Sequence, residues 1–450
     1  MFDTIAAIST ALGVGSISII RVSGEESLSI VNRVFKGPDL EKVDSHTIHY
    51  GHIMDGDKVI DEVLVSVMRS PRSFTTENIV EINCHGGIAP TNRILEVVLK
   101  NGARLAEPGE FTKRAFLNGR IDLTEAEGVM DLIDSKTDKM RELAIQQLGG
   151  SVSQFIKQMR ENLIQVIAQM EVNIDYPEYD DIKELEHKDL TEPLQKISEL
   201  MEKTLQESKN AKIIKEGIMT SIIGKPNVGK SSLLNALLEE DKAIVTDIPG
   251  TTRDIIEGFI NIDGVLLHII DTAGIRNTED KVESIGVQKS MSFIKQAELI
   301  LFVLNNNEAI TEEEKELYEQ IQSKNHIVIV NKIDLEKQLD TSFIQEDIIY
   351  ISTVENKGLL DLKNKIREMY HFEQLEQTDF TYMSNARSLA LLEKAKQYID
   401  ESVHGIEAGV PVDMALIDLK EAWDTLGEII GETYTNELLD ELFSRFCLGK

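Results

Sequence analysis

The octapeptide Gly224-Lys225-Pro226-Asn227-Val228-Gly229-Lys230-Ser231 decides the fold of the central part of this 450-residue chain. It follows an apolar, strand-like run, Ile218–Ile223, and precedes an expected helix, Ser232–Leu238. A glycine-rich turn between a strand and a helix is typical of a phosphate-binding loop, where backbone N–H groups and the helix N-terminus surround an anion. The alternative is a chance glycine-rich turn, which would not require the strand before it and the helix after it.

Individual side chains of this loop suit a nucleoside triphosphate with its magnesium ion. Lys230 places a point charge on the β- and γ-phosphates, and the Ser231 hydroxyl can bind Mg²⁺. The nucleotide-binding residues predicted from this segment are Gly224, Asn227, Val228, Gly229, Lys230, Ser231 and Ser232.

A second motif, Asp271-Thr272-Ala273-Gly274, ends the apolar strand predicted at Val265–Ile270. An acidic residue at the end of such a strand can join the metal shell, and the N–H of Gly274 can sense a γ-phosphate. All four residues, Asp271, Thr272, Ala273 and Gly274, are therefore predicted to contact the nucleotide. The same motif begins a segment able to change conformation when the phosphate is released.

A third motif, Asn331-Lys332-Ile333-Asp334, ends the strand predicted at Ile327–Val330. The Asp334 carboxylate can accept hydrogen bonds from N1 and N2 of guanine, which adenine cannot supply, so the motif predicts preference for GTP over ATP. The triplet Ser352-Thr353-Val354 is expected to close over the base, although most such GTPases carry Ala where this chain has Thr353. The base-binding residues predicted here are Asn331, Lys332, Asp334, Ser352, Thr353 and Val354.

The segment between the first two motifs is a polar loop, Thr246–Asp254, before a strand expected at Ile255–Ile262. Thr252 is the candidate for a switch threonine that binds Mg²⁺, and the alternative is a simple connection to the strand. Ile275 follows the second motif, where many GTPases place a glutamine that orients water. Arg276 and Glu283 are the candidate replacements, and a surface position for Glu283 stays open from the residues alone.

The composition is that of a globular chain, with 42% hydrophobic and 28% charged residues. No apolar run reaches the roughly 18 residues of a membrane helix, and the first residues do not resemble a secretory signal, so a cytoplasmic location is expected. The net charge of −31 repels nucleic acid at long range, so any RNA binding must be local or shared with a basic partner. Cys447 could be a thiolate nucleophile, but a buried or packing role is favoured because no activating His is nearby in sequence. The pair Cys84-His85 is expected to be structural, since it has no further metal ligands.

Hydrophobic periodicity predicts an α/β region followed by helices. Strand-like runs at Ile17–Val22, Glu62–Met68 and Ile79–Cys84, with a helical pattern at Thr91–Asn101, predict a compact α/β unit. From Thr124 the pattern becomes one long helical segment, interrupted near 174–186 and resumed over 190–212.

The chain alternates strands with helices from 217 to 370, which predicts βαβ units in a parallel sheet, and it is helical again after 378. The fold class is therefore α/β plus α, with a nucleotide domain inserted into a discontinuous helical domain. The expected domains are 1–118 (N-terminal α/β), 119–215 (helical, first segment), 216–372 (P-loop GTPase) and 373–450 (helical, second segment).

Several longer segments resemble the bacterial tRNA modification GTPases of the MnmE/TrmE family, and the resemblance covers the whole chain. The segments are Asp3–Ala7, Ile20–Gly24, Glu81–Gly87, Pro108–Gly119 and Phe446–Lys450. The resemblance implies an N-terminal folate-binding and dimerising domain, a helical domain from two segments and an inserted Ras-like P-loop domain. It also implies a homodimer that acts with an FAD-binding partner on the wobble uridine of tRNA, adding a carboxymethylaminomethyl or aminomethyl group.

The resemblance assigns ligands to residues that would otherwise be taken for surface charges. Arg21, Glu81, Arg120 and Lys450 match positions that hold a 5-formyl-tetrahydrofolate-type one-carbon donor, although some members have Lys in place of Arg120. Arg21 and Lys450 can pair with folate carboxylates, and Glu81 can accept N–H bonds from the pterin.

The resemblance also implies activation by K⁺ when two GTPase domains meet. The ion would be held by Asn227 and by backbone oxygens around Thr246, Ile248 and Thr251, with Thr246 and Thr251 also at the GTP site. Glu283 is implied as the water-orienting residue, so the expected catalytic residues are Glu283, Lys230 and Thr252. The cofactors expected are GTP, Mg²⁺, K⁺ and the folate donor.

A regulatory or assembly GTPase, for example in ribosome biogenesis, is the alternative function, because many GTPases with switch loops only report nucleotide state. The tail Cys447–Lys450 and the pair Arg21 and Glu81 distinguish the two hypotheses, since a pure assembly switch does not need them.

Overall fold

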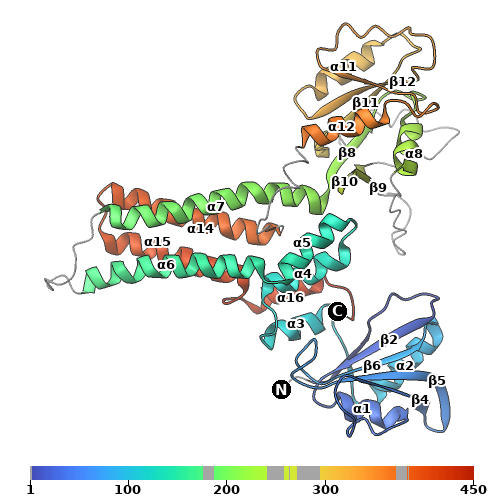
Figure 1. Cartoon of the computed structure of the whole chain (residues 1–450), viewed down its shortest axis with the longest axis vertical. Coiled ribbons are helices and arrows are strands. Elements are labelled where there is room, and N and C mark those ends of the chain that lie inside the picture. Colours follow the sequence, from blue (N-terminus) through green and yellow to red (C-terminus); the bar gives the residue numbers. More distant parts are fainter. Residues whose placement is uncertain are drawn as a thin grey trace. The chain divides into compact units, whose positions relative to one another are not determined.

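The computed structural model describes residues 3–175, 187–240, 258–262, 264–270, 294–370, 383 and 385–449 (Figure 1). The chain forms two compact units. Unit 1 comprises Met1–Met130, Gln147–Glu199 and Ala390–Lys450, and unit 2 comprises Asp131–Gln146 and Leu200–Leu389. A helical region and two separate sheets are present, which confirms the α/β plus α class expected from the sequence.

Unit 1 begins with a seven-stranded sheet in the order β3-β4-β5-β6-β2-β1-β7. Its neighbouring strands are antiparallel except for the parallel pair β1 and β7. Helices α1 and α2 cover one face. The bounds are β1 (Ile5–Ile8), β2 (Ile17–Ser23), α1 (Ser27–Val34), β3 (Phe35–Lys36), β4 (Thr47–Asp55), β5 (Lys58–Met68), β6 (Ile79–His85), α2 (Ile88–Lys100) and β7 (Arg104–Leu105).

Alternation along β5 explains why one face of the sheet is covered by α1 and α2, whereas the opposite face is uncovered around Leu64. On β5 the side chains of Val63, Val65 and Val67 are buried in a core that includes apolar residues of α1 and α2, whereas Leu64 is 48% exposed. Successive side chains point to opposite faces of a strand, so Leu64 lies on the sheet face opposite to α1 and α2. We call this the open face.

Helices form the rest of unit 1 and extend into unit 2. Helix α6 packs along α15, and α7 is joined to α14 by a hydrogen bond from Ser198 Oγ to Asp400 Oδ1 of 2.5 Å (Figure 1). Within the described residues, no helix is long and apolar enough to cross a membrane. The bounds are α3 (Glu110–Leu117), α4 (Leu123–Asp134), α5 (Asp138–Leu148), α6 (Ser151–Asp175), α7 (His187–Glu216), α14 (Ala386–Glu407), α15 (Val412–Ile430) and α16 (Asn436–Ser444).

The single long helical segment expected from Thr124 is divided into three helices, α4, α5 and α6. The second break falls at Gly149 and Gly150, and Gly150 has φ +79°, a left-handed conformation that ends α5. The apolar pattern continues through both breaks, so periodicity alone did not reveal them.

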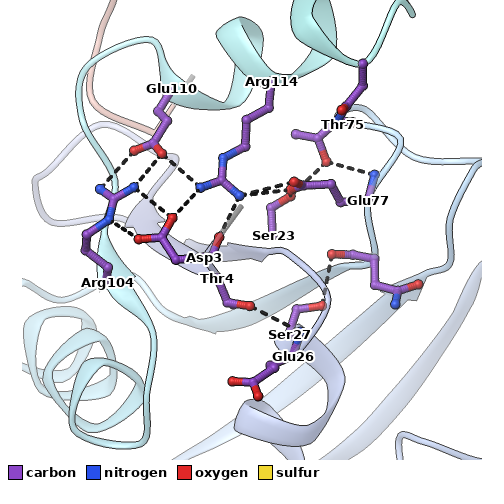
Figure 2. Close-up of polar contacts among 12 residues, drawn as sticks. Asp3, Thr4, Ser23, Glu26, Ser27, Thr75, Glu77, Arg104, Glu110 and Arg114 are labelled. Carbon is purple, nitrogen blue, oxygen red and sulfur yellow. Dashed lines mark hydrogen bonds and ion pairs between the residues drawn. The ribbon is translucent and has the colours of Figure 1, made fainter. Parts of the chain in front are cut away.

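An ionic cluster around the buried Arg114 joins the start of the chain to α3 (Figure 2). Arg114 is 2% exposed, and its guanidinium lies 3.0 Å from Asp3 Oδ1, 3.1 Å from Glu77 Oε1 and 2.9 Å from Glu110 Oε1. Arg104 binds Asp3 and Glu110 at 2.6 Å each. Buried charges are tolerated when they are paired in this way, so the cluster fixes α3 against β1 and β7.

The two arginines lower the pKa values of two carboxyl groups in this cluster. The hydrogen bond from Arg104 is the main cause for Asp3. Burial alone would raise the pKa of Glu110, but hydrogen bonds from Arg104, the Glu107 backbone and Arg114 together lower it. A carboxyl group with a lowered pKa stabilises the folded state above its unfolded pKa, and this contribution is lost as the pH falls through the lowered value.

Replacing Arg104 with methionine is therefore expected to cost about 1 kcal/mol at pH 7, a modest value because its side chain is partly exposed. The difference from the wild type should shrink as the pH falls through the lowered pKa values of Asp3 and Glu110, because the carboxyl groups become protonated there. Hydrogen exchange of the β1 amides at pH 7 and pH 3 measures it, with Arg141→Met, which removes an exposed ion pair, as the control. A difference that grows in acid would contradict the assignment.

Unit 2 contains a six-stranded sheet in the order β13-β12-β11-β8-β10-β9. Apolar residues of α8 and α12 pack on one face, and those of α11 on the other. The bounds are β8 (Ile218–Ile223), α8 (Lys230–Glu240), β9 (Gly258–Ile262), β10 (Val265–Ile270), β11 (Leu299–Asn305), α11 (Glu312–Ile321), β12 (His326–Asn331), β13 (Ile348–Tyr350) and α12 (Leu359–Met369).

Five of these six strands are parallel to one another, but β9 is antiparallel to β10. The expectation of a purely parallel sheet was therefore wrong at this edge. The connection from Ile262 to Val265 is too short for a crossover and makes a hairpin, in which Gly264 N–H donates to Asn261 Oδ1 at 2.8 Å. The parallel strands β8, β11 and β12 end at the same edge, where their loops form the candidate site.

Candidate functional site

The loop after β8 adopts a conformation that only its own residues permit. Gly224, Asn227 and Gly229 have φ values of +145°, +62° and +99°. A Cβ atom on Gly224 would lie 2.2 Å from Val303 O, and one on Gly229 would lie 2.2 Å from Asn331 Nδ2. Glycine is therefore required twice, both for the backbone angle and for the close approach of the neighbouring strands.

Lys230, the first residue of α8, folds its side chain back over this loop. Its Nζ donates to the carbonyl oxygens of Gly224 at 2.7 Å and Lys225 at 2.6 Å. Burial lowers the pKa of Lys230, because the charged ammonium is partly removed from water. Ser231 and Ser232 follow in the first turn of α8, where the helix N-terminus favours an anion.

The motif after β12 is hydrogen-bonded directly to the phosphate loop. The fully buried Asn331 donates from Nδ2 to Val228 O at 3.0 Å, and its Oδ1 accepts the Lys332 N–H at 2.8 Å. Lys332 Nζ donates to Asn227 O at 2.6 Å. Two motifs whose bonded residues are 103 and 105 positions apart in the sequence thus form one structure.

Asp334 and Ser352, both predicted to contact the base, are joined by a hydrogen bond. The Ser352 hydroxyl, which is fully buried, donates to Asp334 Oδ1 at 2.6 Å. Ser352 and Lys357 exchange backbone hydrogen bonds of 3.1 Å, which closes the loop. Thr353 is half-buried and Val354 is 84% exposed at its tip. The hydrogen bond holds the carboxylate at the edge of the site.

One ion pair at this site was missed in the sequence. Lys225 Nζ lies 2.7 Å from Glu314 Oε2, and the Glu314 side chain is only 6% exposed. Glu314 also completes a capping box at the start of α11 with Thr311. The spacing Thr311-x-x-Glu314 before an amphipathic run predicts such a box, but it does not reveal the partner on a distant loop.

Part of the predicted site lies outside the described residues. This holds for Thr252, predicted as the switch threonine, for Glu283, predicted to orient water, and for Lys450, predicted to bind folate. The remaining predicted residues outside the described ranges are Thr246, Ile248, Thr251, Asp271, Thr272, Ala273 and Gly274.

A second group of predicted residues gathers on the open face in unit 1. Arg21 and Glu81 are cross-strand partners on β2 and β6, and Arg21 Nη2 lies 2.8 Å from Glu81 Oε1. The Arg21 guanidinium is 6.0 Å from the ring centre of Phe74 and 5.6 Å from that of Phe111. Both charged side chains are about one-fifth exposed, at 19% and 21%.

Arg120 joins the same group through Phe74. Its Nη1 donates to Phe74 O at 2.6 Å, and its guanidinium lies 4.9 Å from the Phe74 ring centre. The chain returns to β1 at its C-terminal end, where Ser9 Oγ donates to Gly449 O at 3.1 Å. Gly449 has φ +88°, and a Cβ there would lie 2.2 Å from Ile8 O.

The two cysteines differ in environment. Cys84 is buried on β6, as expected, and burial raises the pKa of its thiol. Cys447 is exposed, so the expectation of a packed side chain was wrong. The apolar packing in this turn is made by Phe446, which is 6% exposed and belongs to a core with Phe443 and Phe116.

Comparison with known proteins assigns the family. The sequence profile of the GTP-binding protein TrmE N-terminus matches residues 4–120, and that of the MnmE helical domain matches residues 123–447. The tRNA modification GTPases MnmE of Bacillus cytotoxicus and Bacillus thuringiensis (strain Al Hakam) are each 54% identical over 456 aligned positions, covering 100% of both chains. The G domain of the T. maritima FeoB iron transporter is 26% identical and covers 34% of this chain and 98% of its own, with a TM-score of 0.27. On the two profiles and the full-length relatives, this chain belongs to the MnmE family of tRNA modification GTPases.

Proposed function

We propose that the chain is a K⁺-stimulated GTP hydrolase whose turnover drives modification of the wobble uridine of certain tRNAs in the cytoplasm. With an FAD-binding partner it adds a carboxymethylaminomethyl or aminomethyl group at uracil C5. The observation that carries the GTPase part is the direct connection of the phosphate loop to the base motif, through Asn331 and Val228 at 3.0 Å and through Lys332 and Asn227 at 2.6 Å.

Each half of this connected site suits one part of GTP. Lys230 provides the charge for the β- and γ-phosphates, and the glycines of the loop bring backbone N–H groups close to them. Asp334, held by Ser352, offers its carboxylate to N1 and N2 of guanine. Glu283 and Thr252 complete the proposed catalytic set, with Asp271–Gly274 as the γ-phosphate sensor.

The described residues suit both proposed metal ions. The Ser231 hydroxyl in the first turn of α8 is a hard oxygen donor of the kind that Mg²⁺ prefers. Asn227 is exposed at the tip of the phosphate loop, where its amide oxygen can reach a K⁺ ion together with backbone oxygens around Thr246, Ile248 and Thr251. When bound, K⁺ supplies positive charge beside the phosphates as negative charge shifts in the transition state.

The folate part of the proposal rests on the group around Arg21. The guanidiniums of Arg21 and Arg120 both lie over the ring of Phe74, and the carboxylate of Glu81 is paired with Arg21. A 5-formyl-tetrahydrofolate-type donor presents N–H groups to Glu81 and carboxylates to the cations, with Lys450 as the fourth residue. The bound folate would supply the one-carbon unit.

The open face supports association of two copies. Exposed apolar side chains on it come from three strands, β2, β4 and β5: Ile17 at 64%, Ile48 at 66%, Tyr50 at 58% and Leu64 at 48%. Of these, Ile48, Tyr50 and Leu64 lie on the neighbouring strands β4 and β5, and a patch of exposed apolar side chains of this kind marks a contact surface. We therefore assign homodimerisation to an N-terminal domain over residues 1–118, followed by helical segments 119–215 and 373–450 around a GTPase domain at 216–372.

The net charge of −31 bears on how tRNA is held. Phosphate backbones are bound mainly by Lys and Arg, and this chain has 47 of these against 78 acidic residues. The proposal therefore gives most of the tRNA contact to the FAD-binding partner.

The test is GTP turnover in matched KCl and NaCl buffers, for the wild type and Asn227→Ala. The wild type should be at least about tenfold faster in KCl, because the ion stabilises transition-state charge, and Asn227→Ala should lose that difference. Asn235→Ala, an exposed asparagine on α8, is the matched control and should keep it. Equal wild-type turnover in both salts would remove K⁺ stimulation from the proposal and leave GTP hydrolysis standing.

A further inference from the structure

The phosphate loop needs restraint from outside because its backbone is strained. Among its positive φ values is that of Asn227, at +62°, which is not a glycine. Such a conformation persists only when the surrounding structure holds it. The contacts that hold Gly224 to Gly229 therefore determine how well its N–H groups are aligned for a phosphate.

The first and second halves of the loop are restrained differently. The second half is held by Asn331 on Val228 and by Lys332 on Asn227. The carbonyl groups of the first half, at Gly224 and Lys225, accept their hydrogen bonds from Lys230 Nζ. In the proposed function this same ammonium binds the β- and γ-phosphates, so it cannot keep both carbonyl bonds once the nucleotide is bound.

The side chain of Lys225 gives the first half a restraint that does not depend on Lys230. Its Nζ lies 2.7 Å from Glu314 Oε2. That same oxygen accepts the N–H of Thr311 at 2.9 Å and its hydroxyl at 3.0 Å. The carboxylate is thus fixed at the N-terminus of α11, where the helix dipole favours a negative charge.

The position of Glu314 is also fixed relative to the segment that directly follows the base-binding motif Asn331–Asp334. The segment that leads from β11 into α11 contains Asn306, whose Nδ2 donates to Leu335 O at 3.0 Å and whose carbonyl accepts Gln338 N–H at 2.9 Å. Because Glu314 is only 6% exposed, water competes little for the ion pair, so it is stronger than an ordinary surface pair.

We propose that Glu314 is a positioning residue for GTP binding and hydrolysis, acting through Lys225 to hold the first half of the phosphate loop. Glu314 also keeps the Lys225 ammonium away from the phosphates, leaving Lys230 as the lysine that contacts them. The inference rests on the proposed GTP site and adds a residue to it.

The experiment measures release of a fluorescent GDP analogue by stopped flow, and steady-state GTP hydrolysis, in the full-length chain. Glu314→Gln is the informative variant, because glutamine can keep the capping box while the charge is lost. Glu314→Gln and Lys225→Met should each speed GDP release about five- to tenfold, the worth of one well-formed charged hydrogen bond. The double variant should be no faster than either single variant.

Two further variants separate positioning from general stability. Lys225→Arg, whose guanidinium can still reach the Glu314 carboxylate, should release GDP as slowly as the wild type does. Lys315→Met, which removes the exposed pair with Glu312 on the same helix, should release GDP like the wild type. The melting temperature of Glu314→Gln should stay close to that of the wild type.

Unchanged GDP release in Glu314→Gln and Lys225→Met would overturn the inference, as would effects that simply add in the double variant. Faster release accompanied by a large fall in melting temperature would also overturn it, because the role would then be structural. Failure of the proposed GTP site itself looks different, since the wild type would then show no specific GDP binding.

Discussion

Replacing Lys230 with alanine is expected to lower GTP turnover about a hundred- to thousandfold, the range seen when one preorganised charge-stabilising group is removed from an active site. The ammonium already sits inside the loop, 2.7 Å from Gly224 O and 2.6 Å from Lys225 O. Burial lowers its pKa, and the negative charge of a bound triphosphate would favour its charged form again.

Single-turnover hydrolysis, combined with calorimetric titration of GTP, separates the two consequences of this change. Loss of affinity reports ground-state contact with the phosphates, and loss of the rate constant reports stabilisation of transition-state charge. Asn235→Ala, in the same helix but exposed, should leave both values unchanged. Turnover retained in Lys230→Ala would mean that the phosphates bind elsewhere in the chain.

Asp334→Asn is expected to weaken GTP binding about a hundredfold and to make xanthosine triphosphate the better ligand. The carboxylate accepts from N1 and N2 of guanine, and an amide that donates instead suits the carbonyl that xanthine carries at position 2. Two charged hydrogen bonds at roughly 1.5 kcal/mol each account for an effect of this size.

Competition between GTP and xanthosine triphosphate for a fluorescent analogue measures this change of specificity. Ser352→Ala is the matched variant, because it removes the 2.6 Å hydrogen bond to Asp334 Oδ1 but keeps the carboxylate. It should weaken GTP about tenfold without favouring xanthine, since only the orientation of the acceptor is lost. An unchanged preference for guanine in Asp334→Asn would show that Asp334 is not the base-binding residue.

The sequence predicted local features of this fold well, where one short segment determines its own structure. The strand Ile218–Ile223 and the strand Val265–Ile270 have the bounds that apolar runs indicated. The glycines of the phosphate loop were expected on chemical grounds, and the close approach of Val303 O to Gly224 gives the steric reason. The structure adds that Asp334 and Ser352, which follow the neighbouring parallel strands β12 and β13, are joined by a hydrogen bond.

Features that depend on distant partners could not be predicted. Glu314 resembles any acidic residue near a helix start, and its role emerges only when Lys225 is seen beside it. The antiparallel direction of β9 was also missed, because periodicity gives the type of an element but not its direction. The exposure of Cys447 depends on which neighbour enters the core, and Phe446 does so instead.

The sheet of unit 1 ends on two very short strands, β3 and β7, of two residues each. A sheet edge attracts further chains through its row of unpaired N–H and C=O groups, and long, flat edges promote aggregation. β3 pairs with only two residues of β4, and β7 with only two residues of β1, so each outermost strand offers an incoming chain very few ladder positions. In the dimer proposed above, contact through the open face around a twofold axis would give a closed pair that does not extend further.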